Sequence, residues 1–296
     1  FNYSVQKVIS YSQWSIFLNC PHKWALQYRD KQVKPEQNIQ FLFGKAIHNT
    51  IQQYITQMYE TSGAEADRSD VKGYFENELS EIYKADYKKN NNTHFTNPSE
   101  LREFFDDGID ILDFLQKKKA GYFNKKGWHL IGCEIPIQLT PHPLYKNVIF
   151  KGSLDMVLYH EPTNKYKIID FKTSTKGWND MAKRDEIKQY QLILYKQFFS
   201  QIYNIPLEDI DIEFFILKRK LYENCDFPQK RIQIFSPPSG KIKLNRATQL
   251  LDNFIISSFN TDGTYKTGDF EPNATLDNCK WCIHKDSKNL CPKGIS

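Results

Sequence analysis

The stretch that decides the fold is FKGSLDMVLYHEPTNKYKIIDFKTS, which runs from Phe150 to Ser174. Apolar and polar residues alternate in its first half, and a β-rich run makes up its second half. Between them, Glu161-Pro162-Thr163-Asn164 has the composition of a turn, so the stretch predicts a β-hairpin. If these turn residues form the loop, Tyr159 faces Tyr166 across the hairpin.

Counting along this register puts Asp155 directly opposite Asp170, with Lys172 on the same face of the second strand. Directly opposed side chains have Cβ atoms about 5 Å apart, and like charges there are destabilising unless something neutralises them. Mg²⁺ or Mn²⁺ would do so, because these cations favour carboxylate and carbonyl ligands. Such a site could hydrolyse a phosphodiester, with Lys172 orienting the attacking water or stabilising charge on the phosphate. The alternative is an edge hairpin whose charged side chains face only solvent.

Length and composition indicate a globular intracellular protein. The 296 residues can bury a substantial core, as one large domain or two modest ones. A net charge of +5 permits nucleic acid as a partner without demanding it. No membrane-spanning run or signal-peptide pattern is evident, so we expect a cytoplasmic or nucleoid-associated protein without a membrane partner. The G-x4-G-K-[ST] loop of ATPases is also missing from the sequence.

Before the hairpin, most of the chain has helical periodicity. His48 lies beside the apolar stripe of one expected helix, where a histidine is either a packed core residue or a ligand. Polar loops are expected at 61–70 and 89–98, and a strand at 128–139. The expected helices are two short ones within 10–30 that meet at Cys20, and longer ones at 41–59, 71–87 and 99–119.

After the hairpin, helices and strands alternate, which predicts an α/β fold with helices packed on a central sheet. Gln191 and Tyr195 lie one turn apart on the buried face of a helix. A glutamine in an apolar stripe is costly unless it is hydrogen-bonded, so it either points at the aspartate site or lies at the margin of the core. We expect a polar connection at 176–184, helices at 185–199 and 241–258, and strands at 211–218 and 231–235.

Three of the six cysteines cluster in DNCKWCIHKDSKNLCPK, residues 277–293. Tetrahedral metal centres need four ligands. Cys20 precedes a proline and interrupts a helix, which makes it the first choice for the fourth ligand, with His22 and His284 as competitors. The alternative is a set of inert thiols. The clustered cysteines are Cys279, Cys282 and Cys291.

The order of these motifs resembles the iron–sulfur branch of the PD-(D/E)XK nucleases, the RecB/AddB-like group. It runs cysteine, glycine plus helical histidine, G-S-L-D, I-D-F-K, Q-x3-Y and three cysteines, from Cys20 to Cys291. The resemblance implies a PD-(D/E)XK nuclease core, a central mixed sheet flanked by helices, with an N-terminal helical region and a C-terminal cysteine-rich cluster segment. The implied organisation is a single nuclease domain over 1–296, with a mainly helical part at 1–125, a catalytic α/β core at 126–260 and an iron–sulfur tail at 261–296.

The resemblance also implies a role for each motif residue. Lys172 would help to activate water, while Gln191 and Tyr195 would complete the active-site motif. The spacing of the last two cysteines is longer than is usual in the family, which leaves zinc as an alternative to a structural [4Fe-4S] cluster. The implied ligands of the catalytic Mg²⁺ or Mn²⁺ are His48, Asp155, Asp170 and the carbonyl of Phe171, and those of the cluster are Cys20, Cys279, Cys282 and Cys291.

The resemblance further implies a channel around single-stranded DNA, with salt-dependent and nearly sequence-blind binding. The function predicted is a metal-dependent DNA exonuclease on single-stranded ends, 5′ to 3′, in DNA recombination, repair or processing, with a separate helicase or recombination protein as a candidate partner. The alternatives are an endonuclease or flap nuclease of the same fold and a catalytically silent scaffold that binds DNA ends. The candidate DNA-binding residues are Lys172, Lys176, Lys183, Arg184 and Lys188 along the phosphates, with Trp178 stacking on a base.

Overall fold

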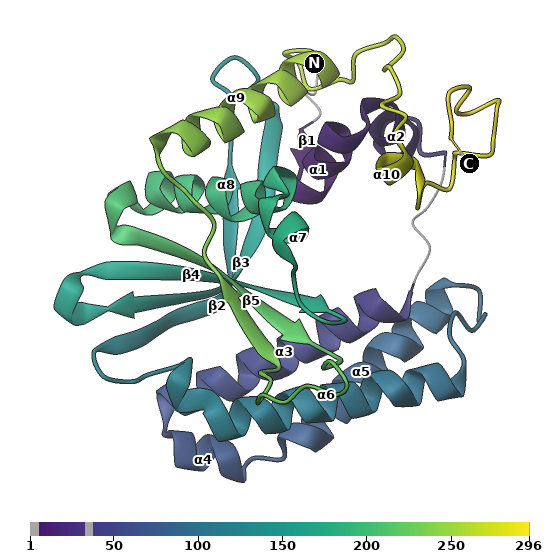
Figure 1. Ribbon diagram of the computed structural model, residues 1–296. Helices are drawn as coiled ribbons and strands as arrows, with labels where there is room; N and C mark the ends of the chain where they lie inside the picture. The colour runs from purple at the N-terminus through teal and green to yellow at the C-terminus, as the bar shows by residue number, and fades with distance from the viewer. Residues whose placement is uncertain (1–5, 33–37, 296) are drawn as a thin grey trace.

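The computed structural model describes residues 6–32 and 38–295. Within these residues, a six-stranded mixed sheet forms the centre of the molecule (Figure 1). One hydrophobic cluster lies between the sheet and α3, α5 and α6, and a second lies between the sheet and α1, α2, α8 and α9. The principal helices are α1 (Tyr11–Asn19), α2 (Pro21–Trp24), α3 (Ile39–Glu60), α5 (Val71–Lys89), α6 (Pro98–Lys118), α8 (Glu186–Tyr203) and α9 (Lys241–Ser258).

The strand connections confirm an α/β fold with a mixed sheet flanked by helices. β3 pairs antiparallel with β2 and β4 and parallel with β1. β4 pairs parallel with β5, and β5 pairs antiparallel with β6. The strands are β1 (Lys7–Ile9), β2 (Trp128–Leu139), β3 (Val148–His160), β4 (Lys165–Ser174), β5 (Ile210–Lys218) and β6 (Ile232–Phe235).

The hairpin of β3 and β4 has the predicted register. Tyr159 pairs with Tyr166. The loop closes through a short 3₁₀ turn, and Asn164 adopts the left-handed conformation (φ 52°) that asparagine tolerates. Along the hairpin, Met156 and Ile169 belong to the cluster under α3, whereas Val157 and Ile168 belong to the cluster under α8.

Three short helices and one strand were not predicted from the sequence, among them α10 (Leu276–Cys279) in the tail. The segment 61–70, predicted as a loop, contains α4 (Gly63–Arg68), whose first turn is capped by the Ser62 side chain. The connection at 176–184 contains α7 (Asp180–Arg184), which Asn179 caps in the same way. Both helices are too short to show an apolar stripe, so only their caps could have revealed them. Strand β1 was not predicted.

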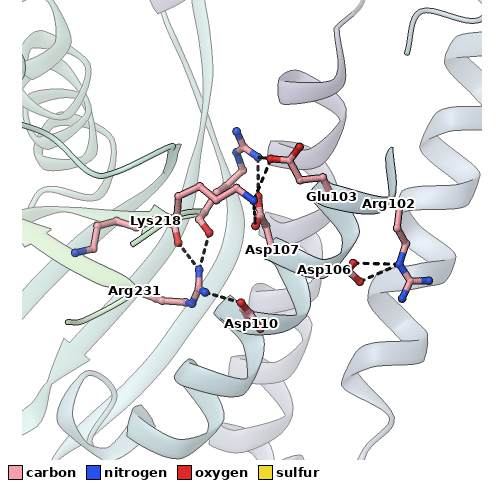
Figure 2. Close-up of polar contacts among 9 residues, drawn as sticks. Arg102, Glu103, Asp106, Asp107, Asp110, Lys218 and Arg231 are labelled. Carbon is pink, nitrogen blue, oxygen red and sulfur yellow. Dashed lines mark hydrogen bonds and ion pairs between the residues drawn. The ribbon is translucent and has the colours of Figure 1, made fainter. Parts of the chain in front are cut away.

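Charged side chains fasten the loop between β5 and β6 to α6 (Figure 2). The Asp107 carboxylate on α6 lies 2.7 Å from Arg219 Nη1 and 2.9 Å from Lys220 Nζ. One turn along α6, Asp110 pairs with Arg231, which also donates to the carbonyl of Arg219. These contacts hold the edge of the sheet against the helical layer.

In the ranges 6–32 and 38–295, no helix has both the length and the apolar character needed to cross a membrane.

Candidate active site

Two aspartates come together where the β3–β4 ladder ends. The last backbone pair of the ladder is Met156 with Ile169, and the aspartates lie one residue beyond it. There the backbone N–H of Phe171 donates to Asp155 Oδ2 at 2.7 Å. The side chain of Asp155 is 17% exposed and that of Asp170 is 3% exposed. The end of the ladder therefore leaves two nearly enclosed carboxylates side by side.

Burial makes both carboxylates hard to ionise. It raises the pKa of Asp155 to about 6, against the attraction of Lys172. Burial also raises the pKa of Asp170 to about 6; Lys172 opposes this rise and the neighbouring Asp155 adds to it. A positive charge placed between the two carboxylates would offset both the cost of burying them and the repulsion between them.

Lys172 lies on the same face of β4 as Asp170. Its Nζ is 2.6 Å from Asp170 Oδ2, and its side chain is 33% exposed. The ammonium group thus reaches the buried carboxylate from the open side of the site. In this position it can contact both the carboxylate and a bound phosphate.

His48 approaches the aspartates from α3. Its Nδ1 lies 3.9 Å from Asp155 Oδ2, and its ring packs on Phe171 with 5.7 Å between centroids. Burial and, to a lesser extent, the positive charge of Lys172 lower the pKa of His48 to about 4. The imidazole is therefore neutral at physiological pH, and its buried Nε2 has no hydrogen-bond partner. A neutral imidazole with a free nitrogen is the form that binds metals.

Gln191 and Tyr195 face the same region from α8. Tyr195 is 6% exposed, and burial raises its pKa, with Asp170 as a further cause. The buried Oε1 of Gln191 has no partner, while the Gln191 side chain opposes the rise in the Tyr195 pKa. A Cβ at Gly152 would lie 3.0 Å from the Tyr195 ring and hydroxyl. The glycine of G-S-L-D therefore gives the tyrosine room beside β3.

The donor set fits a divalent cation, although its members are not arranged around one point. Among the described residues, no group of three His, Cys, Asp or Glu side chains is placed to hold a metal ion. Lys172 contacts Asp170 Oδ2, and the Phe171 N–H contacts Asp155 Oδ2. A metal would have to compete with both contacts. The unpartnered His48 nitrogen and the two hard-to-ionise carboxylates favour replacement of these two contacts by a metal.

Two further polar residues join the site, and the sequence-based prediction did not include them. Gln52 lies one turn after His48 on α3, and its amide contacts the carbonyl of Asp155 and the side chain of Glu134. Glu134 belongs to β2 and lies opposite Asp155. The spacing of four from His48 to Gln52 is a sequence signal, because residues four apart share a helix face.

The cysteine-rich tail closes onto the N-terminal helices. The same small pocket is lined by Cys20, at the junction of α1 and α2, and by the tail cysteines. Both ring nitrogens of His22 face backbone carbonyls, those of Phe270 at 3.0 Å and Leu290 at 2.6 Å, which leaves neither for a metal. His284 lines the pocket with a buried, unpartnered Nε2. The tail cysteines that line the pocket are Cys279, Cys282 and Cys291.

The predicted DNA-binding residues lie on and around α7. Lys176 is exposed, and its Nζ lies 4.9 Å from the ring centre of Tyr222. Trp178 is half-buried and packs on Phe214 and Phe235, so part of the ring expected to stack on a base is already covered. The other residues are the half-buried Lys183, the exposed Arg184 and the exposed Lys188, whose Nζ lies 5.8 Å from the Trp178 ring centre.

A hairpin that presents two aspartates and a lysine from a mixed sheet, with helices on both faces, is the arrangement of a hydrolytic nuclease. The family model of the PD-(D/E)XK nuclease superfamily matches residues 8–292, and the chain belongs to this superfamily. A comparison with curated proteins finds no match.

One solved structure similar to this chain is the crystal structure of "Putative exonuclease" from Eubacterium rectale. It has a TM-score of 0.51 and 15% sequence identity, and the similarity covers 94% of this chain and 86% of that one. At this identity the similarity supports the fold.

Proposed function

We propose that this nuclease is a metal-dependent deoxyribonuclease that degrades single-stranded DNA from its ends. The observation that carries the proposal is the convergence of Asp155, Asp170 and Lys172 at the end of the β3–β4 ladder, with neutral His48 beside them. Two buried carboxylates with raised pKa values are poorly explained by stability alone, because their ionised forms are disfavoured there.

Each residue has a role in this proposal. His48, Asp155, Asp170 and the carbonyl of Phe171 would hold Mg²⁺ or Mn²⁺. When bound, the cation lowers the pKa of water and stabilises charge on the phosphoryl group. The Lys172 ammonium orients the attacking water and pairs with a phosphate oxygen. Gln191 and Tyr195, which border the carboxylates from α8, complete the proposed active site.

The substrate and direction come from the family resemblance. We propose single-stranded DNA, 5′ to 3′ polarity, a place in recombination or repair, and membership of the RecB/AddB-like branch. The basic residues around α7 support a nucleic-acid path, since phosphate contacts supply most of the sequence-independent affinity. The similar Eubacterium rectale protein carries the name of an exonuclease.

We also propose that the tail holds a structural [4Fe-4S] cluster, with zinc as the alternative. The supporting observation is that Cys20 and the three tail cysteines border one pocket. Burial raises the pKa of the Cys291 thiol, and the other three cysteines add to this effect. A cationic metal centre would remove that repulsion among thiolates.

The test is cleavage of single-stranded and duplex DNA labelled at either end, with Mg²⁺, with Mn²⁺ and with chelator. We expect metal-dependent loss of the single strand, with the 5′ label released first. Asp170→Ala should abolish cleavage. Lys172→Ala should reduce it about 10²- to 10⁴-fold, the usual contribution of a positioned proton-transfer or charge-stabilising group.

Two other outcomes separate the alternatives. Internal cuts on circular or flapped DNA, before any end label is released, would identify an endonuclease or flap nuclease. DNA binding without cleavage, in every metal and equal for the wild type and both variants, would identify a scaffold and refute the proposed chemistry.

A further inference from the structure

We propose that Gln52 and Glu134 form a positioning pair. The pair fixes the positions of His48 and Asp155, two of the proposed metal ligands, relative to each other. The proposal rests on the metal-dependent nuclease function above. It concerns residues outside the set that the motifs indicate.

Gln52 joins three elements of the site. It is 6% exposed and lies one turn after His48, so it shares the face of α3 that looks toward the sheet. Its Nε2 donates to the backbone carbonyl of Asp155 at 2.8 Å and to Glu134 Oε1 at 2.8 Å. One amide therefore connects the helix of His48 to the strand of Asp155 and to β2. Losing it would remove this donor from both the Asp155 carbonyl and the Glu134 carboxylate.

Glu134 has an unusual backbone conformation for a residue within a strand. Its φ is 51°, in the left-handed region that non-glycine residues rarely adopt. Such a conformation costs free energy and persists where the surrounding structure maintains it, often at functional sites. The register of β2 also shifts between Leu130 and Gly132, and bulges of this kind re-aim side chains near active sites.

The hydrogen bonds of Glu134 hold its carboxylate beside the metal ligands. Oε1 accepts from Gln52, and Oε2 accepts from Ser153 Oγ at 2.7 Å. Because Cys133 pairs with Met156 and Ile135 pairs with Leu154, Glu134 stands directly opposite Asp155.

This placement makes three adjacent strands carry a row of carboxylates, those of Glu134, Asp155 and Asp170. Like charges opposed across strands are destabilising. A neutral glutamine at 134 could keep both contacts without that repulsion, accepting from Gln52 through its carbonyl oxygen and donating to Ser153 Oγ through its amide. A cation held next to Glu134 would therefore explain its negative charge. Gln52 would set the distance between Glu134 and Asp155.

Outer partners of metal ligands typically contribute 10- to 100-fold to metal affinity. We expect Gln52→Met, which keeps the length of the side chain and removes both donors, to weaken Mn²⁺ binding by that factor. Glu134→Gln should weaken it less, because a glutamine can accept from Gln52 and donate to Ser153 Oγ, and so loses only the charge. The matched control is Gln53→Met, since Gln53 is the next residue on α3 and is exposed.

The experiment is titration of each full-length protein with Mn²⁺ by isothermal calorimetry, without DNA, after circular dichroism has shown equal folding. Cleavage is then measured against Mn²⁺ concentration. Excess Mn²⁺ should restore the maximal rate of Glu134→Gln and should not restore Asp170→Ala. A merely structural role would not produce this rescue.

The outcomes are distinguishable. If the wild type binds no Mn²⁺ and cleaves nothing, the proposed function fails. If the wild type binds Mn²⁺, and Gln52→Met and Glu134→Gln bind it within twofold of the control, the positioning pair is refuted while the nuclease proposal stands. Should Gln52→Met fail to fold, the exposed Glu134→Gln decides alone.

Discussion

At the scale of single residues, the site is built from groups that are poorly suited to a stable fold. Asp155 and Asp170 are enclosed by protein, and burial raises the pKa of each to about 6. At neutral pH the folded chain must hold both as carboxylates or keep a proton on one of them. Either state costs free energy, and the activity proposed for this site would explain why the cost is kept.

This cost predicts how stability depends on pH. An aspartate in an unfolded chain has a pKa near 3.9. The folded pKa of Asp170 is higher, so between about pH 4 and pH 6 the folded protein binds more protons than the unfolded one. Stability contributed by this group is therefore greatest below pH 4 and is lost as the pH rises through 6.

Asp170→Asn removes the titration, because an amide does not ionise. In chelator, we expect the variant to gain stability over the wild type as the pH rises from 4 to 7, by on the order of 2 kcal/mol. The measurement is urea unfolding at several pH values. Parallel pH profiles for the two proteins would show that folding does not raise the pKa of Asp170.

At the scale of elements, the strongly patterned segments were predictable. The strand at 128–139 and the helix at 241–258 match the structure at both ends. The hairpin register followed from one turn and the period of two, so a single pair, Tyr159 with Tyr166, placed both aspartates. The local pattern alone was sufficient there because the apolar faces are long enough to exclude a shift by one residue.

Other features depend on contacts that no local pattern contains. The helix α4 has a polar sequence. It is stabilised by the Ser62 cap and by the burial of Ala66. The alternation of residues along β2 does not mark Glu134 as functional. Its left-handed backbone is seen only in the folded structure, where β2 pairs with β3. The packing of Trp178 on Phe214 likewise requires the folded sheet.

The join between α6 and the β5–β6 loop gives a prediction at this scale. Asp107 has a 7% exposed side chain and contacts both Arg219 and Lys220. Asp107→Ala leaves the Arg219 guanidinium, which is 11% exposed, without its nearest partner, and breaking such a buried pair costs about 3 kcal/mol. We expect a loss of that size in the free energy of unfolding in urea.

The matched control lies on the preceding residue of the same helix (Figure 2). Asp106 is 56% exposed and pairs with Arg102, which is 72% exposed. Asp106→Ala should change stability by about 0.5 kcal/mol or less, because exposed ion pairs contribute little. Equal losses for the two variants would mean that the burial of the Asp107–Arg219 pair does not determine the effect.

At the scale of the whole molecule, the two ends of the described chain are fastened together. The carbonyl of Asn19 accepts hydrogen bonds from the side chains of Asn273 and Asn278 in the tail. On α1, Tyr11 donates to the carbonyl of Ile187 on α8, the helix that also carries Gln191. The N-terminal helices thus contact both the tail and the helix that carries Gln191.

The last prediction separates a structural cluster from a catalytic one. In protein purified without oxygen, Cys279→Ala should remove the iron and its absorption band, and proteases should then cut the tail faster. Mn²⁺ affinity in calorimetry should stay within about twofold, because the metal ligands proposed on α3, β3 and β4 are not among the residues that line the cysteine pocket. Direct coupling would instead change affinity by the 10- to 100-fold typical of a ligand's own partners.

The control variant is Cys225→Ala, which removes a half-buried free cysteine from the loop between β5 and β6. It should retain iron and a protected tail. Zinc in place of iron would appear as metal without the absorption band, and would leave the same requirement for four thiolates. If Cys279→Ala keeps a full complement of metal and a protease-resistant tail, hydrogen bonds such as those of His22 to Phe270 and Leu290 are sufficient to close the molecule. The pocket would then be a cluster of thiols and not a metal centre.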